Sequence, residues 1–163
     1  MKKFALEFRW AFIFIVMMLL WMLMEKMTGL HDVHLDKHAT YTNFVSIPAM
    51  LIYFFALRQK RIRDYGGYMT WTQGFISGVI ISLIVSILTP LMQYITTTVI
   101  TPDYFTNIAE YAVSTGLKTR EAAEAYFNLK NYIIQSSMGA TFMGVFSSAF
   151  VALFTMKKKK TLS

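Results

Sequence analysis

The chain has 163 residues, of which 55% are hydrophobic and 15% are charged, with a formal net charge of +7 and no cysteine. The absence of cysteine excludes disulfides, thiolate metal sites and cysteine nucleophiles. The basic residues flank long hydrophobic runs and form no separate basic region, so the positive charge does not predict nucleic-acid binding. The composition predicts a single all-α membrane domain over residues 1–163.

The first uncharged run, residues 10–24, extends into an expected helix over residues 8–27. The lysines Lys2 and Lys3 in front of it also fit a signal peptide. However, residues 25–27 read Glu-Lys-Met, where cleavage needs small residues. We therefore expect an uncleaved span, and its near lack of small residues favours a peripheral or lipid-facing position.

The second run, residues 39–57, is the weakest of the expected spans. Its strongly apolar part, residues 44–57, is shorter than the ~20 residues that cross a hydrocarbon core. Pro48 kinks a helix there or lies in its first turn. The segment is either re-entrant or a full crossing.

The third run, residues 71–100, is longer than a crossing needs, so we expect it to tilt, to kink at Pro90 or to emerge partly from the bilayer. The fourth run, residues 131–156, ends at four consecutive lysines. Together the four runs predict a membrane four-helix bundle.

The distribution of charge predicts an orientation. With four crossings, 11 of the 16 basic residues fall on one side of the membrane. By the positive-inside rule this side, which also holds both chain ends, is cytoplasmic. The segregation fails if the second run does not cross, which favours a full crossing. The 11 residues are Lys2, Lys3, Arg9, Arg58, Lys60, Arg61, Arg63, Lys157, Lys158, Lys159 and Lys160.

Small residues recur every four positions in the last two spans. This spacing places them on one helix face, where they allow two backbones to approach closely. Either the two spans pack against each other, or one of the rows faces a second protein. The rows are Gly74, Gly78, Ser82 and Ser86, ending at Pro90, and Ser136, Ala140, Gly144 and Ser148, ending at Ala152.

Polar side chains in the spans would suit a transporter or channel. Gln73, Gln93 and Gln135 can bridge helices or line a polar path. No span has an ionisable residue in its middle, which argues against a proton-coupled transporter.

The loop after the first span contains three histidines, His31, His34 and His38. If residues 32–38 are helical, His34 and His38 share a face, with His31 near it, and such imidazoles can hold zinc or copper. No zinc signature is met, and capping, hydrogen bonding or lipid headgroup contact explains the same residues. Catalysis would need these histidines together with Glu25 and Asp103, which nothing in the sequence assembles.

Residues 102–130 form the only sizeable extramembrane segment. A helix is expected to begin at Thr101-Pro102-Asp103 and to end at Gly116. A second helix, capped by Thr119, can run straight into the fourth span. The first helix has an apolar stripe that lies on the bilayer, covers the span ends or docks a partner. The stripe consists of Tyr104, Phe105, Ile108, Tyr111 and Ala112.

Several motifs in the chain are not generic apolar ones. They are Gly29-Leu30-His31-Asp32, His38, Tyr41-Thr42-Asn43, Ala56-Leu57-Arg58, Gly67, Met69-Thr70, Gln73-Gly74-Phe75, Ser77-Gly78 and Pro102-Asp103-Tyr104-Phe105. In these motifs the chain resembles the domain-of-unknown-function 4199 family, and the resemblance covers nearly its whole length. The resemblance implies a four-span bacterial inner-membrane protein, found mainly in Bacteroidetes, and brings no activity or catalytic residues.

We therefore expect a non-enzymatic accessory protein of an envelope system, without a cofactor. Its expected partners are membrane lipids and either another membrane protein or further copies of the chain. The alternatives are a small transporter or channel, and a metal-responsive membrane protein.

Overall fold

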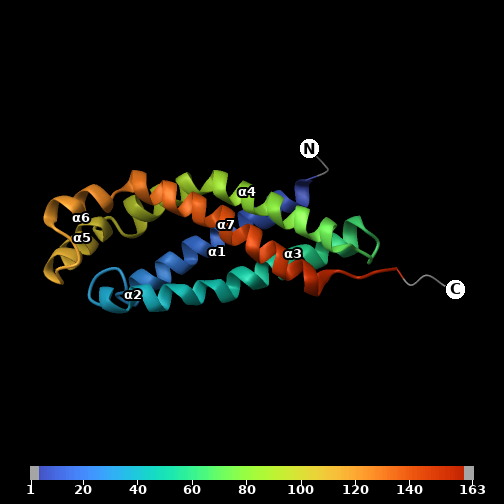
Figure 1. The fold of residues 1–163 in the computed structure, drawn as a ribbon, viewed down its shortest axis with the longest axis horizontal. Helices are drawn as coiled ribbons and strands as arrows, with labels where there is room; N and C mark the ends of the chain where they lie inside the picture. Colours follow the sequence, from blue (N-terminus) through green and yellow to red (C-terminus); the bar gives the residue numbers. More distant parts are fainter. Residues whose placement is uncertain (1–3, 160–163) are drawn as a thin grey trace.

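The computed structural model describes residues 4–159, which form an elongated bundle of helices (Figure 1). Within these residues there is no β-structure apart from one isolated bridge between Met69 and Lys157, so the predicted all-α class is confirmed. The elements are α1 (Ala5–Met27), α2 (Leu35–Tyr41), the 3-10 turn η2 (Thr42–Val45), α3 (Ser46–Asp64), α4 (Trp71–Ile95), the π-helical turn η3 (Thr96–Ile100), α5 (Tyr104–Ser114), α6 (Arg120–Tyr126) and α7 (Leu129–Thr155).

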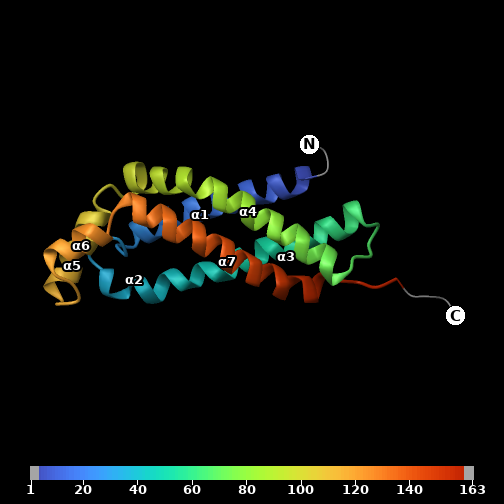
Figure 2. The ribbon, with the colours of Figure 1, turned by 45° about the horizontal axis from the view of Figure 1, so that its top comes forward.

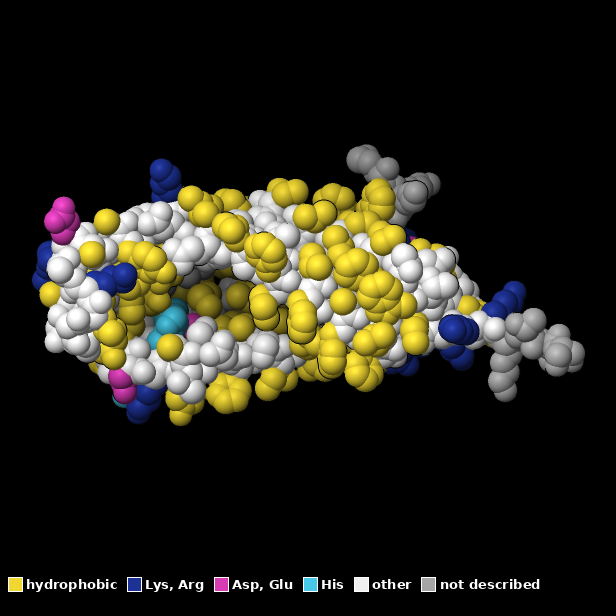
Figure 3. Space-filling view, viewed as in Figure 1, with side chains coloured by type: hydrophobic (Ala, Val, Ile, Leu, Met, Phe, Trp, Pro, Cys, Tyr) yellow, Lys and Arg dark blue, Asp and Glu magenta, His cyan; other side chains and the backbone are white. Residues whose placement is uncertain are grey.

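Within residues 4–159, four stretches of helix are long and apolar enough to cross a membrane. They are Ala5–Met27, Leu35–Asp64, Trp71–Ile100 and Leu129–Thr155. Hydrophobic side chains cover the middle of the molecule, and basic side chains lie toward its two ends (Figure 3). This distribution is the one that a bilayer-spanning bundle requires.

The second stretch is longer than the expected residues 39–57. It joins α2, η2 and α3, and the backbone tightens to 3-10 geometry over Thr42–Val45. Pro48 lies in the first turn of α3, where its missing N–H removes no bond from the helix. Beyond residue 57 the helix continues through the basic residues to Asp64.

The helices α4 and α7 make the most extensive contact in the molecule (Figure 2). They run antiparallel, because Gly78 of α4 lies against Ser148 of α7 while Ser82, one turn later, lies against Gly144, one turn earlier. The two rows of small residues therefore face each other. Ser86 Oγ adds a hydrogen bond to the Ser137 carbonyl oxygen (2.9 Å).

This contact leaves no room for a side chain at Gly78. A Cβ atom there would lie 2.6 Å from Ser148 Cβ and 3.2 Å from Ser148 Cα. The far ends of the rows are looser: Ala140 packs at the margin of the core, and Ser136 bonds back to the Tyr132 carbonyl oxygen of its own helix.

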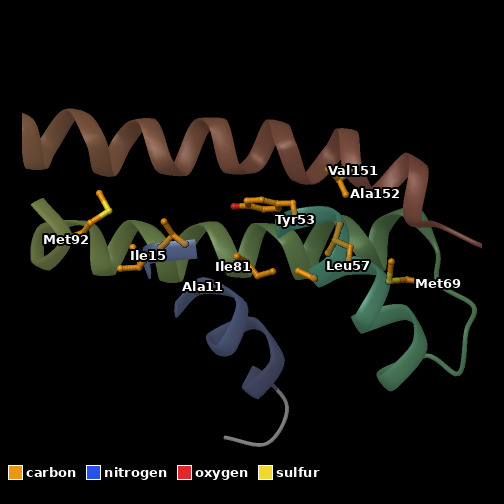
Figure 4. Close-up of a cluster of buried hydrophobic side chains, with 11 residues drawn as sticks. Ala11, Ile15, Tyr53, Leu57, Met69, Ile81, Met92, Val151 and Ala152 are labelled. Atoms are coloured by element: carbon orange, nitrogen blue, oxygen red, sulfur yellow. The ribbon is translucent and has the colours of Figure 1, made fainter. Parts of the chain in front are cut away.

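Tyr53 of α3 joins all four long helices at the centre of the core (Figure 4). Its hydroxyl is hydrogen-bonded to Ser82 Oγ of α4 (2.8 Å), and its ring meets Phe14 of α1 edge-on at a centroid distance of 6.0 Å. The same hydroxyl would lie 2.8 Å from a Cβ atom on Gly144 of α7. Buried side chains from all four long helices thus meet in one cluster.

One end of the bundle holds the start of α1, the α3–α4 connection and the end of α7 (Figure 1). Arg61 Nη1 donates to the Thr155 carbonyl oxygen (2.8 Å), so part of the basic run caps the C-terminus of α7. Three of the basic residues used to predict orientation, Lys2, Lys3 and Lys160, lie outside the described residues.

Residues 101–128, which we call the cap, cover the opposite end of the bundle. The helix α5 begins one residue after its N-cap Asp103, whose side chain makes no capping bond, whereas Thr119 Oγ1 accepts the Ala122 N–H at the start of α6. The helix α6 does not run straight into the fourth span. It stops at Tyr126, and Asn128 Oδ1 caps a new helix by accepting the Asn131 N–H (3.0 Å).

Candidate functional site

A buried carboxylate lies where the cap meets the bundle. Glu25 is in the last turn of α1 and has no exposed surface. The chain then turns back through Gly29, whose φ of +75° is in the left-handed region that favours glycine. Leu30 N–H bonds to the Glu25 carbonyl oxygen and Gly29 N–H to that of Lys26, both at 3.0 Å, which is the Schellman pattern for ending a helix. This turn brings His31 back over Glu25.

Two histidines share one oxygen of this carboxylate. His31 Nε2 lies 3.1 Å from Glu25 Oε2, and His38 Nε2, from α2, lies 3.5 Å from the same atom. The other oxygen, Oε1, accepts a hydrogen bond from Trp21 Nε1 (2.6 Å). His31 is buried and His38 is 20% exposed. We call Glu25, His31 and His38 the histidine cluster.

The cap closes over the histidine cluster through α5. The Tyr104 ring lies 5.0 Å from the His31 ring and 5.7 Å from the His38 ring, centroid to centroid. Asn107 Nδ2 donates to the His31 carbonyl oxygen (3.1 Å). Of the three uses expected for the apolar stripe, covering the span ends is the one that Tyr104 matches, because its side chain is buried and packs on the histidines.

Burial raises the pKa of the Tyr104 phenol, and the neighbouring Tyr132 raises it further. The two hydroxyl groups lie 3.2 Å apart. Tyr104 therefore remains a neutral hydrogen-bonding group well into the alkaline range.

The third loop histidine, His34, is not part of the cluster. It is exposed and precedes α2 as its N-cap, with a non-helical φ of −123°. His34 and His38 share a helix face only if residues 32–38 are helical, and this condition is not met because α2 begins at Leu35. Asp103 is exposed at the start of α5.

The proximity of Glu25 to His31 and His38 was not predicted from the sequence. The signal was present in Thr28-Gly29-Leu30, since glycine followed by a hydrophobic residue after a helical run marks the tight reversal seen here. Such a reversal returns the next residue to the last turn of the helix.

A second buried polar cluster lies at the other end of α1. Lys60 Nζ is 2.7 Å from both Glu7 Oε1 and Asp64 Oδ2, and Ser77 Oγ donates to the same Glu7 oxygen (2.8 Å). Glu7 is 1% exposed and Lys60 7%. The cluster ties α1 to α3 and α4, so Lys60 is a structural cation as well as one of the basic residues that predict orientation.

The three glutamines considered as a polar path do not gather. Gln73 completes a capping box with Thr70 at the start of α4. Gln93 is near the other end of the same helix, about 30 Å away at 1.5 Å per residue. Gln135 is exposed and accepts a hydrogen bond from the Tyr126 hydroxyl (3.2 Å).

The family model described as "Protein of unknown function (DUF4199)" matches residues 9–157, which is nearly the whole chain. No curated protein and no solved structure matches the chain. The match includes both polar clusters except for Glu7.

Proposed function

The chain belongs to the DUF4199 family of proteins of unknown function, and we propose that it is a non-enzymatic accessory protein of a bacterial inner membrane. In this proposal it crosses the bilayer four times with both ends in the cytoplasm, and its cap presents a binding surface to another component of the envelope. The observation that carries the proposal is the fixed attachment of the cap to the bundle.

The attachment of the cap involves three separate parts of the chain. Asn107 bonds to the loop after α1, Tyr104 packs on the histidines, and the Tyr104 hydroxyl lies beside that of Tyr132 on α7. A segment held at several points keeps one surface facing outward and loses little conformational entropy when a partner binds it. This is the behaviour expected of a docking platform.

The exposed side of the cap has features of a protein-binding surface. Leu117, in the turn between α5 and α6, is 71% exposed, and Tyr126 is 41% exposed. Three acidic side chains of α5 and α6 are also exposed, namely Glu110, Glu121 and Glu124. Exposed apolar side chains together with charged ones are the usual composition of a transient protein interface.

The rows of small residues also favour the cap as the binding surface, because the two rows pack against each other within the chain. Since Gly78 and Gly144 pack against Ser148 and Ser82, they are not free to receive a second protein. A membrane-protein partner, or a second copy of the chain, would therefore meet the cap or the outer helix faces.

The orientation is tested by single cysteines, for which the cysteine-free chain gives no background. In intact cells with a permeabilised outer membrane, Leu35→Cys and Thr115→Cys should react with a membrane-impermeant maleimide, and Ile62→Cys should react only after lysis. Labelling of Ile62→Cys in intact cells would contradict the proposed orientation.

The docking surface is tested by site-specific photocrosslinking in native membranes. A photoreactive amino acid at Leu117 should crosslink to a specific protein. The same group at Phe142, which is 70% exposed in the middle of α7, is the matched control and should crosslink mainly to lipid. A second position on the cap, Glu121, is tested with the same photoreactive amino acid. If neither Leu117 nor Glu121 yields a protein crosslink, the cap is not a docking platform and the proposal fails.

A further inference from the structure

We propose that Glu25, His31 and His38 bind a divalent transition-metal ion of the zinc class. This inference rests on the proposed function in one respect: the bound ion would stabilise the loop to which the cap is attached. The metal site itself is argued from the distances, burial and donor atoms of the three side chains.

The distances fit a metal site with little rearrangement. Ligand atoms around a tetrahedral zinc ion, with bonds of 2.0–2.1 Å, are separated by about 3.3 Å. The two distances from Glu25 Oε2, 3.1 Å to His31 Nε2 and 3.5 Å to His38 Nε2, lie on either side of this value. All three ligand atoms lie within 4.8 Å of one another, so a small movement of His38 completes the geometry.

The burial of Glu25 supplies a reason for a cation to bind. A carboxylate without exposed surface needs a compensating positive charge. Among the described residues, no lysine or arginine forms an ion pair with Glu25, and the basic groups beside its carboxylate are the two imidazoles. Without a metal, each histidine can approach the oxygen only by carrying a hydrogen on Nε2, because a carboxylate oxygen accepts and does not donate. A divalent ion that replaces these hydrogens supplies the missing charge.

The donor atoms select the class of metal. Two imidazole nitrogens and one carboxylate oxygen suit zinc and its neighbours in the first transition row. Calcium and magnesium prefer six or more oxygen ligands, which this cluster does not offer. Three protein ligands leave the fourth coordination position open. In zinc sites of this kind, water or another small ligand occupies that position.

An ion can reach the site from the surface. His38 is 20% exposed, and histidine side chains with an acidic side chain beside them are visible inside a hollow in the face shown in Figure 3. The hollow lies next to the end of the molecule where α2, α5 and α6 gather.

Metal binding would join three segments. Glu25 is on α1, His31 is in the following turn and His38 is on α2. Because Asn107 of the cap bonds to the His31 carbonyl oxygen, the position of the cap depends on the same loop. The cluster is therefore placed to make the cap surface more rigid when zinc is present.

The test uses the full chain, purified in mild detergent with an affinity tag that contains no histidine, and stripped of metal with a chelator. Zinc chloride is then titrated in competition with a chromogenic zinc chelator. We expect one zinc ion per chain, and no competition by magnesium. His38→Gln should weaken zinc binding by ~10-fold or more. Even the loss of a residue that only hydrogen-bonds to a metal ligand typically lowers metal affinity by about 10–100-fold.

His34→Gln is the matched control, because His34 is exposed, lies in the same loop and is outside the cluster. It should leave zinc affinity unchanged. The proposal is overturned if the parent chain binds no zinc, or if His34→Gln weakens binding as much as His38→Gln does.

A second variant keeps the test valid if His38→Gln does not fold. His38→Cys retains a metal ligand, and cobalt(II) bound there should show thiolate-to-metal charge-transfer absorption, with no background from the cysteine-free parent. Absence of this absorption in the folded variant refutes the site. Zinc binding is measured on the isolated chain, so its failure is distinct from a failure of the cap to crosslink to a partner.

Discussion

Replacing Gly78 by alanine should push α4 and α7 apart at their closest approach. The new Cβ atom would lie 2.6 Å from Ser148 Cβ, whereas carbon atoms in contact are normally separated by about 3.5–4.0 Å. The overlap is therefore about 1 Å. Because Ser148 Cβ is attached directly to its backbone, no rotamer change removes the overlap, and one of the helices must move.

Overpacking of this kind costs about 1–3 kcal/mol. Alanine also stabilises a helix relative to glycine by about 0.5–1 kcal/mol, which partly offsets the clash. Gly139→Ala is the matched control on α7, since a Cβ atom there meets nothing within 4 Å and gains the same helix propensity. The free energy of unfolding of the two variants should differ by about 1–3 kcal/mol, with Gly78→Ala the less stable.

Unfolding in mixed detergent micelles, followed by far-UV circular dichroism, measures this difference. Ser148→Gly removes the opposing Cβ atom and should recover much of the loss when it is combined with Gly78→Ala. Equal stability of Gly78→Ala and Gly139→Ala would show that the close approach of α4 and α7 does not limit the packing.

Three further outcomes are expected. Lys60→Met should destabilise the fold by about 3–5 kcal/mol, because it leaves Glu7 buried without its cation, and Lys158→Met should have no effect in the same unfolding assay. Tyr104→Ala should increase hydrogen exchange in residues 101–128, while Tyr104→Phe, which keeps the ring on the histidines, should change it little. The raised pKa of Tyr104 means that the folded state keeps a proton which the unfolded state loses above pH ~10, so stability should fall as pH rises through that range. In Tyr104→Phe the part of this alkaline loss that is due to Tyr104 should vanish, and an unchanged pH profile would contradict the assignment.

The positions of the long helices could be predicted from the sequence, because a helix that crosses the hydrocarbon core of a bilayer needs a long run of uncharged residues. The second stretch was underestimated for a physical reason. Its last two turns contain four basic residues, which suggest solvent exposure, yet Lys60 is neutralised by Glu7 and Asp64 and Arg61 caps α7. Such pairing depends on helices that are distant in sequence, and no local pattern reveals it.

The site was predicted in part. The three loop histidines were all candidates, but His34 joins His38 on one face only if residues 32–38 are helical, and α2 begins at Leu35. The carboxylate was not connected to them, since the connection requires a chain reversal at Gly29 and not a helical spacing. In this loop, the signal that ends the helix thus says more than helical periodicity about which side chains lie close together.

The two buried carboxylates of α1 also differ in when their partners are synthesised. Glu25 finds His31 and His38 within the next few turns of the chain, whereas Ser77, which bonds to Glu7, is 70 residues away. During synthesis, the Glu25 end of α1 can reach its final environment as soon as α2 emerges. The Glu7 end has no compensating charge until α3 is made and no complete set of partners until α4 is made. We therefore expect the first helix to insert early but to settle into the bundle late, with its N-terminal end being the last part of it to dock.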